Sequence, residues 1–226
     1  MSELISLLGK ISGRVGNVVF VQRGNTTFIK KRPGKRSTPY SEKEIAHHRK
    51  FGFLCKLAGK VCETGELKYF WKPERWSGRS SYNRIAKENY GRISADTLEG
   101  SITLCPQFGF NVSGYKGKIT ETGFEIKCEP LQKRGGDYGA AAKYIIGGGV
   151  IVLKNPTDKK QPEYRIISFR SEKILFNPGK EISIEIEIKG NDACLFQSYA
   201  EKKVYISVIT LDKNETPIKY SYTMNL

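Results

Sequence analysis

The chain has 226 residues, of which 38% are hydrophobic and 11% aromatic, and it carries a formal net charge of +15. This length and composition suffice for one large or two small globular domains, and no apolar run is long enough to predict a transmembrane helix. The first hundred residues hold 20 Lys and Arg against 9 Asp and Glu, so the N-terminal half predicts an acidic partner: nucleic acid, an anionic surface or an acidic neighbouring subunit.

Residues 9–33 predict a β-hairpin. β-Branched and aromatic residues fill positions 18–21, Arg23-Gly24-Asn25 supply a turn, and a return strand follows over 26–29. An isolated two-stranded hairpin is marginally stable in water, so we expect this one to bury its apolar side against a partner. The predicted partner-binding residues are Val18, Phe20, Arg23, Thr26 and Phe28.

A basic stretch follows the hairpin. Residues 30–36 combine five Lys and Arg with Pro33 and Gly34, which predicts a loop or linker. Lys and Arg in such a loop can contact phosphates without a fixed geometry, so they are candidates for nucleic-acid binding, together with two lysines further along the chain. The candidates are Lys30, Lys31, Arg32, Lys35, Arg36, Lys50 and Lys56.

Two helices are predicted in the next segment. The capping pattern formed by Ser41 and Glu44 predicts a first, basic amphipathic helix. Residues 66–81 are rich in aromatics and predict a structured loop, and a shorter helix is expected from Ser80 or Ser81 until Gly91 ends it. The first helix would pack an apolar stripe against the rest of the chain or against a partner. This stripe consists of Ile45, Phe51, Leu54, Leu57, Ala58 and Val61.

The residue composition changes from about residue 100 onward, where runs of β-forming residues alternate with turn residues. Eight strands are predicted, over 102–105, 115–120, 124–128, 144–153, 164–169, 182–188, 204–210 and 218–223. The glycines at 147–149 are interpreted as loop or bulge positions, because no phosphate-binding pattern continues from them. The predicted fold class is mainly β with a small helical part and an immunoglobulin-like C-terminal β-sandwich. The predicted domains are 1–37, 38–95 and 96–226, and residues 40–95 either form a separate helical domain or cover one face of the sandwich.

No catalytic motif stands out. The two histidines, His47 and His48, are adjacent and would point about 100° apart on a helix, so they cannot bind one metal as an i, i+4 pair does. The five cysteines form no CxxC spacing and predict reduced thiols, mostly buried. We therefore expect no catalytic residues, no metal site and no cofactor.

The segment GKISGRVGNVVFVQRGNTTFIKKRP, followed by Thr38-Pro39 and by a helix containing Arg49-Lys50-Phe51, resembles an uncharacterised family frequent in Bacteroidota and their phage-associated mobile elements. Members of that family pair a Gly-rich basic N-terminal hairpin with an immunoglobulin-like C-terminal region. The resemblance implies this architecture and implies no activity.

These features together favour a non-enzymatic structural or adaptor subunit of a phage-like or other self-assembling particle, which docks by β-augmentation through its N-terminal arm. The alternative is a sequence-independent nucleic-acid-binding protein. The expected partners are protein subunits, either copies of the chain or neighbouring components, with nucleic acid in the alternative. Synthesis in the cytoplasm and incorporation into a virion or similar particle are expected, since the N-terminus makes a poor secretory signal.

Overall fold

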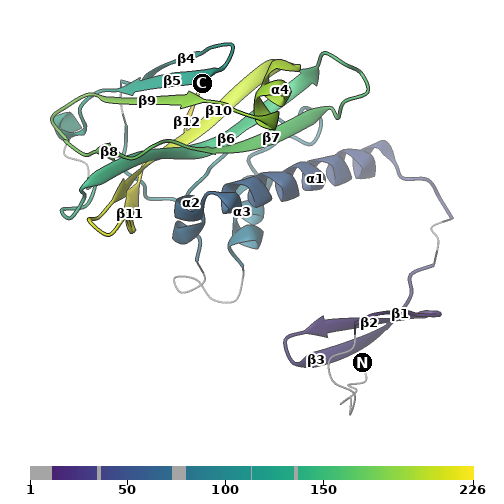
Figure 1. The fold of residues 1–226 in the computed structure, drawn as a ribbon. Coiled ribbons are helices and arrows are strands. Elements are labelled where there is room, and N and C mark those ends of the chain that lie inside the picture. The colour runs from purple at the N-terminus through teal and green to yellow at the C-terminus, as the bar shows by residue number, and fades with distance from the viewer. Residues whose placement is uncertain (1–11, 35–36, 73–79, 113, 135–136) are drawn as a thin grey trace. The chain divides into compact units, whose positions relative to one another are not determined.

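The computed structural model describes residues 12–34, 37–72, 80–112, 114–134 and 137–226. The structure is mainly β, with 38% strand against 23% helix, as the sequence predicts. Contacts between residues divide the chain into two compact units, Met1–Glu42 and Lys43–Leu226. The first unit contains a small sheet, and the second contains helices and two further sheets (Figure 1).

The small sheet of the first unit is an antiparallel meander in the order β1-β2-β3. Its strands are β1 (Gly13–Val15), β2 (Val18–Arg23) and β3 (Thr26–Lys31). Gly-Asn dipeptides form both two-residue turns, and their glycines, Gly16 and Gly24, have φ of 57° and 59°. A positive φ at the first turn position suits glycine and matches the twist of a tight hairpin. The predicted hairpin is therefore present as β2 and β3, and β1 adds a strand that was not predicted.

Three helices open the second unit: α1 (Glu42–Glu63), α2 (Gly65–Phe70) and α3 (Ser81–Tyr90). The start of α1 directly after Ser41 agrees with the predicted capping position. The second predicted helix is confirmed as α3, where the Ser80 hydroxyl accepts a hydrogen bond from the Asn83 backbone N–H at 3.3 Å and Gly91 follows the last turn. In contrast, α2 lies within the segment that was predicted to be a loop.

Two antiparallel sheets form the rest of the unit. The six-stranded sheet has the order β11-β10-β6-β7, with β12 also paired to β10 and β8 also paired to β6, and the three-stranded sheet has the order β4-β5-β9. The strands are β4 (Lys116–Ile119), β5 (Gly123–Cys128), β6 (Tyr144–Pro156), β7 (Tyr164–Arg170), β8 (Ile174–Leu175), β9 (Ile182–Glu187), β10 (Tyr199–Leu211), β11 (Pro217–Tyr220) and β12 (Met224–Asn225). A fourth helix, α4 (Asn191–Gln197), connects β9 to β10, and a 3-10 turn, Leu131–Arg134, follows β5.

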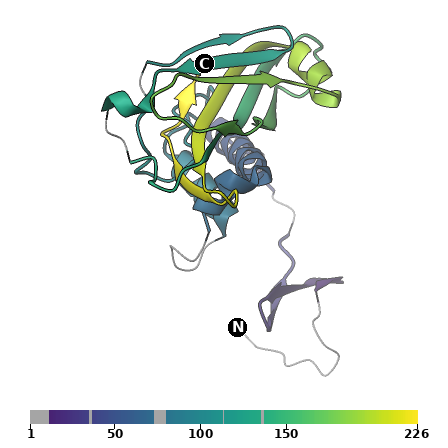
Figure 2. The ribbon, with the colours of Figure 1, turned by 60° about the vertical axis from the view of Figure 1, so that its left-hand side comes forward.

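The helices, the six-stranded sheet and the three-stranded sheet form three successive layers (Figures 1 and 2). One hydrophobic core joins α1 and α3 to the six-stranded sheet, with Leu57, Ile85 and Val150 all buried. A second core joins the two sheets and includes Ile184 and Val208. Because the helices share a core with the sheet, residues 43–226 form one compact unit. The boundary after Glu42 thus differs from the predicted boundaries at 37/38 and 95/96.

Three further local predictions were wrong. Ile102, Leu104 and Cys105 are buried, but residues 102–105 form no strand, because their backbone bonds to side chains. The Thr103 N–H donates to Asn89 Oδ1 at 2.8 Å, and the Leu104 carbonyl accepts from Trp71 Nε1 at 2.8 Å. In the predicted stripe of α1, Ile45 and Phe51 are instead exposed, by 54% and 59%. The buried face of α1 is rotated from the predicted stripe and consists of Lys50, Phe53, Leu54, Leu57, Ala58 and Val61.

The third wrong prediction concerns the glycines at 147–149, which lie inside strand β6. A Cβ atom on Gly147 would lie 2.8 Å from Ile206 Cδ1 and 3.0 Å from Ile184 Cδ1, on the side of the three-stranded sheet. A Cβ atom on Gly148 would lie 3.3 Å from Thr64 Cγ2, on the helical side. The glycines therefore allow both neighbouring layers to approach the central strand closely.

Replacing Gly149 by alanine tests this close packing. Its Cβ would overlap the Tyr205 carbonyl oxygen and lie 2.7 Å from Phe169 Cζ. We expect Gly149→Ala to lower the free energy of unfolding by about 1–3 kcal/mol, the usual cost of overpacking. Gly148→Ala, the matched control, restricts the unfolded chain equally and should cost less. Urea denaturation followed by tryptophan fluorescence measures both, and equal losses would contradict the packing argument.

Candidate interaction surface

The strand register of the first unit assigns its side chains to two faces, since directly opposed residues share a face of a sheet. Phe20 is opposite Gly13 on β1 and Ile29 on β3. Val21 is opposite Phe28, one position along. We name these the Phe20 face and the Phe28 face. The Phe20 face carries Val15, Val18, Phe20, Gln22, Thr27, Ile29 and Lys31, and the Phe28 face carries Arg14, Val19, Val21, Arg23, Thr26, Phe28 and Lys30.

Side-chain contacts hold the end of the sheet near Gly24. The Arg23 guanidinium lies 5.9 Å from the centroid of the Phe28 ring, a favourable cation–π arrangement. On the other face, Thr27 Oγ1 donates to Gln22 Oε1 at 2.9 Å, and Gln22 Nε2 donates to the Gly24 carbonyl at 2.9 Å. The turn that presents Arg23 and Phe28 is therefore fixed by contacts on both faces.

The predicted partner-binding residues do not form one surface. Val18 and Phe20 lie on one face, whereas Arg23, Thr26 and Phe28 lie on the other. This separation follows from the alternation of side chains along a strand. A partner that covers one face of this sheet can contact only one of the two groups.

The basic candidates of the first unit are also separated. Lys30 and Lys31 are consecutive on β3 and therefore point to opposite faces. The Arg32 N–H donates to the Asn17 carbonyl at 2.9 Å and extends the ladder by one bond. Lys35 and Arg36 lie outside the described residues.

The two lysine candidates on α1 belong to the second unit. Lys50 is only 8% exposed, and its Nζ lies 4.4 Å from the centroid of the Tyr90 ring. Lys56 is exposed, with its Nζ 4.6 Å from the Tyr164 ring centroid. Because the stem of Lys50 is buried and its charge lies on an aromatic ring, this residue serves packing better than contact with a phosphate.

Two features of this region were missed at the sequence level. Strand β1 and its Arg14 were not predicted, although the Gly-Asn dipeptide at 16–17 repeats the one at 24–25 and could have identified a second turn. In addition, residues 4–41 contain eight Lys and Arg and no Asp or Glu. This acid-free stretch includes the whole N-terminal sheet, so an acidic partner meets no like charge on it.

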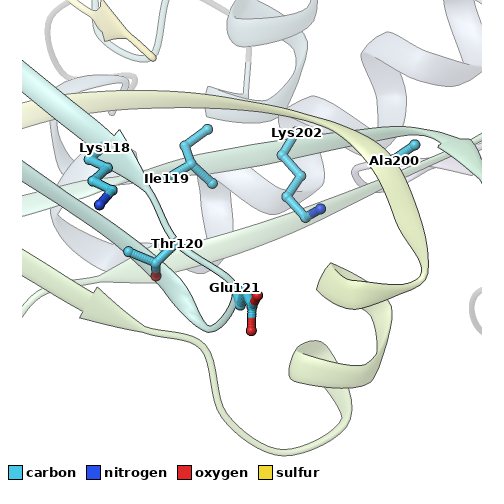
Figure 3. A pocket seen from close by; sticks show the side chains of 6 residues that line it. All are labelled: Lys118, Ile119, Thr120, Glu121, Ala200 and Lys202. Carbon is cyan, nitrogen blue, oxygen red and sulfur yellow. The ribbon is translucent and has the colours of Figure 1, made fainter.

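One hollow of the second unit is lined by polar and apolar side chains. It has a volume of about 610 Å³ and lies between the β4–β5 turn and the start of β10. Lys118, Ile119, Thr120, Glu121, Ala200 and Lys202 line it (Figure 3). Lys202 Nζ donates to the Tyr199 carbonyl at 2.8 Å. This lining offers no imidazole or thiol that could act as a nucleophile or as a base near neutral pH.

The cysteines are all free thiols. Burial raises the pKa of Cys105 to about 12 and that of Cys128 to about 12, so both are protonated and unreactive at neutral pH. Within the described ranges, no group of three or more His, Cys, Asp or Glu side chains could hold a metal ion.

Comparison of the chain with protein-family models, with curated proteins and with solved structures gave no match. The resemblance to the Bacteroidota family and the functional hypotheses therefore stay predictions. Among the described residues, no helix is both long enough and apolar enough to span a membrane.

Substitution of the two α1 lysines tests their assignment to packing. Lys50→Ala removes a buried stem and a cation–π contact, and we expect it to lower the free energy of unfolding by about 1–2 kcal/mol. Lys56→Ala, at an exposed position, serves as the control and should cost less. Chemical denaturation measures both losses. A larger loss for Lys56→Ala would contradict the assignment.

Proposed function

We propose that this protein is a non-enzymatic structural or adaptor subunit of a phage-like or other macromolecular assembly. In this proposal the N-terminal sheet docks on a neighbouring subunit, and the second unit, interpreted as an immunoglobulin-like sandwich, is packed or displayed as a repeated module. The observation that carries the proposal is the presence of a small sheet that forms a compact unit separate from the rest of the chain.

This sheet is too small to bury its own apolar side chains. Its three strands contain 3, 6 and 6 residues, and no second layer covers it among the described residues of the first unit. Val15 is 68% exposed, and both faces carry aliphatic and aromatic side chains. A stable sheet needs a second layer against at least one face. A partner surface would supply that layer. A strand of the partner could also pair with either of the two open strand edges.

Removal of residues 1–36 tests this proposal. We expect nuclease-treated full-length protein to form a species larger than a monomer that persists in high salt, because apolar burial and backbone pairing are weakly screened. The truncated protein should be folded and monomeric, because the second unit keeps both hydrophobic cores. Light scattering gives the masses, and circular dichroism confirms folding. The proposal fails if the truncated chain assembles as the full chain does, or if the full chain stays monomeric throughout.

The acid-free stretch supports a second candidate function, sequence-independent nucleic-acid binding. Eight Lys and Arg without an intervening carboxylate give a cationic segment of the kind that displaces counterions from a phosphate backbone. The two candidates share a partner class defined by negative charge. They differ in salt dependence, because contacts to phosphates weaken steeply as salt rises.

A triple substitution, Lys30→Ala/Lys31→Ala/Arg32→Ala, tests the second candidate. If these residues contact phosphates, the slope of log affinity against log salt should fall by about one for each residue removed. Fluorescence anisotropy with a random-sequence duplex over a salt series measures this slope. The matched control is Lys159→Ala/Lys160→Ala/Lys213→Ala, which removes three exposed lysines of the second unit. An unchanged slope, or the same change in the control, rejects this candidate.

A further inference from the structure

The acidic edge of the second unit is strand β9, which pairs with β5 and with no other described strand. Ile182, Ile184 and Ile186 are buried, while Ser183, Glu185 and Glu187 are exposed on the outer face. Glu185 is directly opposite Glu125 on β5, a like-charge pair that destabilises a sheet. It also forms no salt bridge with another described residue. Glu187 pairs with Lys189 at 3.0 Å, and Lys127, which pairs with Glu125 at 2.6 Å, also interacts with Glu185. Three glutamates thus face two lysines at this place, and a further cation at the open edge would stabilise Glu185.

The backbone of β9 is available for pairing at these same residues. The Ile188 N–H donates to the Thr122 carbonyl at 2.9 Å, which fixes the phase of the ladder, because antiparallel pairs alternate between bonded and non-bonded positions. Counting back from this bond, Glu185 and Glu187 are at non-bonded positions. Their N–H and C=O groups therefore point away from β5 toward the open edge.

Strand β3 in the first unit has the opposite character. The Arg32–Asn17 bond fixes its phase in the same way, so Ile29 and Lys31 direct their backbone groups away from β2. No other described strand pairs with this outer edge. The strand has six residues, as many as β9, and it ends in Lys30-Lys31, directly before Arg32.

Charge decides which edges can pair. Two β9 edges would place glutamates against glutamates, and two β3 edges would place basic side chains against each other. Charged side chains on an edge strand normally discourage association for this reason. A β3 edge beside a β9 edge avoids both of these repulsions, because basic side chains then lie beside glutamates. The Lys and Glu side chains are closest when the two strands run parallel.

We propose that β3 of one copy of this chain pairs edge to edge with β9 of a second copy. The donor and the acceptor are different surfaces, so the contact is heterologous and repeats along an open chain or closes into a ring. This inference rests on the proposed docking through the N-terminal sheet and names the surface that receives it.

Charge reversal tests the pairing in the full-length protein. Lys30→Glu/Lys31→Glu makes both edges acidic, and Glu185→Lys/Glu187→Lys makes both edges basic. Each variant alone should lose association by roughly tenfold or more, because like charges across an interface are strongly unfavourable. A 1:1 mixture should regain the mass of wild-type assemblies, because both kinds of contact become complementary again. Light scattering after nuclease treatment measures these masses.

Three further variants sharpen the test. Glu121→Lys/Glu172→Lys changes the net charge equally at exposed sites outside β9 and should associate as wild type does. Ile29→Pro removes an outward-facing N–H that the meander does not use and should abolish association, whereas Ile29→Val should retain it. Association of Ile29→Pro at wild-type strength would overturn strand pairing.

The inference is also overturned if the mixture stays monomeric, or if the β9 variant assembles as wild type does. If that β9 variant assembles while the chain lacking residues 1–36 does not, docking through the N-terminal sheet stands and its acceptor is another surface. A mass increase that requires added DNA would likewise overturn the pairing and favour the nucleic-acid candidate.

Discussion

The second unit depends on how closely two layers approach strand β6 from opposite sides. Successive residues of a strand face opposite sides, so the adjacent glycines Gly147 and Gly148 open space for both layers. On one side Ile184 of β9 fills the space at Gly147, and on the other Thr64 and Leu67 fill the space at Gly148. Because Ile184 must face this contact, Glu185 must face the solvent. The packing at β6 thus decides which residues of β9 form its outer face.

The sequence predicts those parts of the fold that depend on neighbouring residues. The strand predicted over 182–188 and the Ser80 and Gly91 ends of α3 are examples, because strand patterns and helix caps are local. The errors arise where distant residues decide. Residues 102–105 have the composition of a strand, but Asn89 and Trp71 take their backbone hydrogen bonds. Likewise, only the packing of two distant layers explains why consecutive glycines occupy the interior of a strand, where glycine is otherwise unfavourable.

For the candidate surface, too, only the features that depend on neighbouring residues were predictable. The turn at Gly24 and the basic character of the segment follow from local composition. Phe20 and Phe28 lie on different faces because side chains alternate along a strand. The prediction of one set of partner-binding residues did not take this alternation into account. The role of Lys50 was not predictable from its own helix, because the ring that its ammonium contacts belongs to Tyr90 at the end of α3. A basic helical face can therefore consist partly of packing residues.

The adjacent lysines at the end of β3 bear on how an edge contact can be specific. A shift of one residue in strand register exchanges the two faces of a strand. Only every second residue of β3, including Ile29 and Lys31, turns its N–H and C=O toward the open edge, so such a shift would remove the backbone bonds to β9. The facing of β3 beside β9 is therefore fixed by its own pairing with β2. Backbone bonds would supply affinity and charge would exclude other strands, so specificity for the acidic edge combines one facing of the donor with a complementary charge.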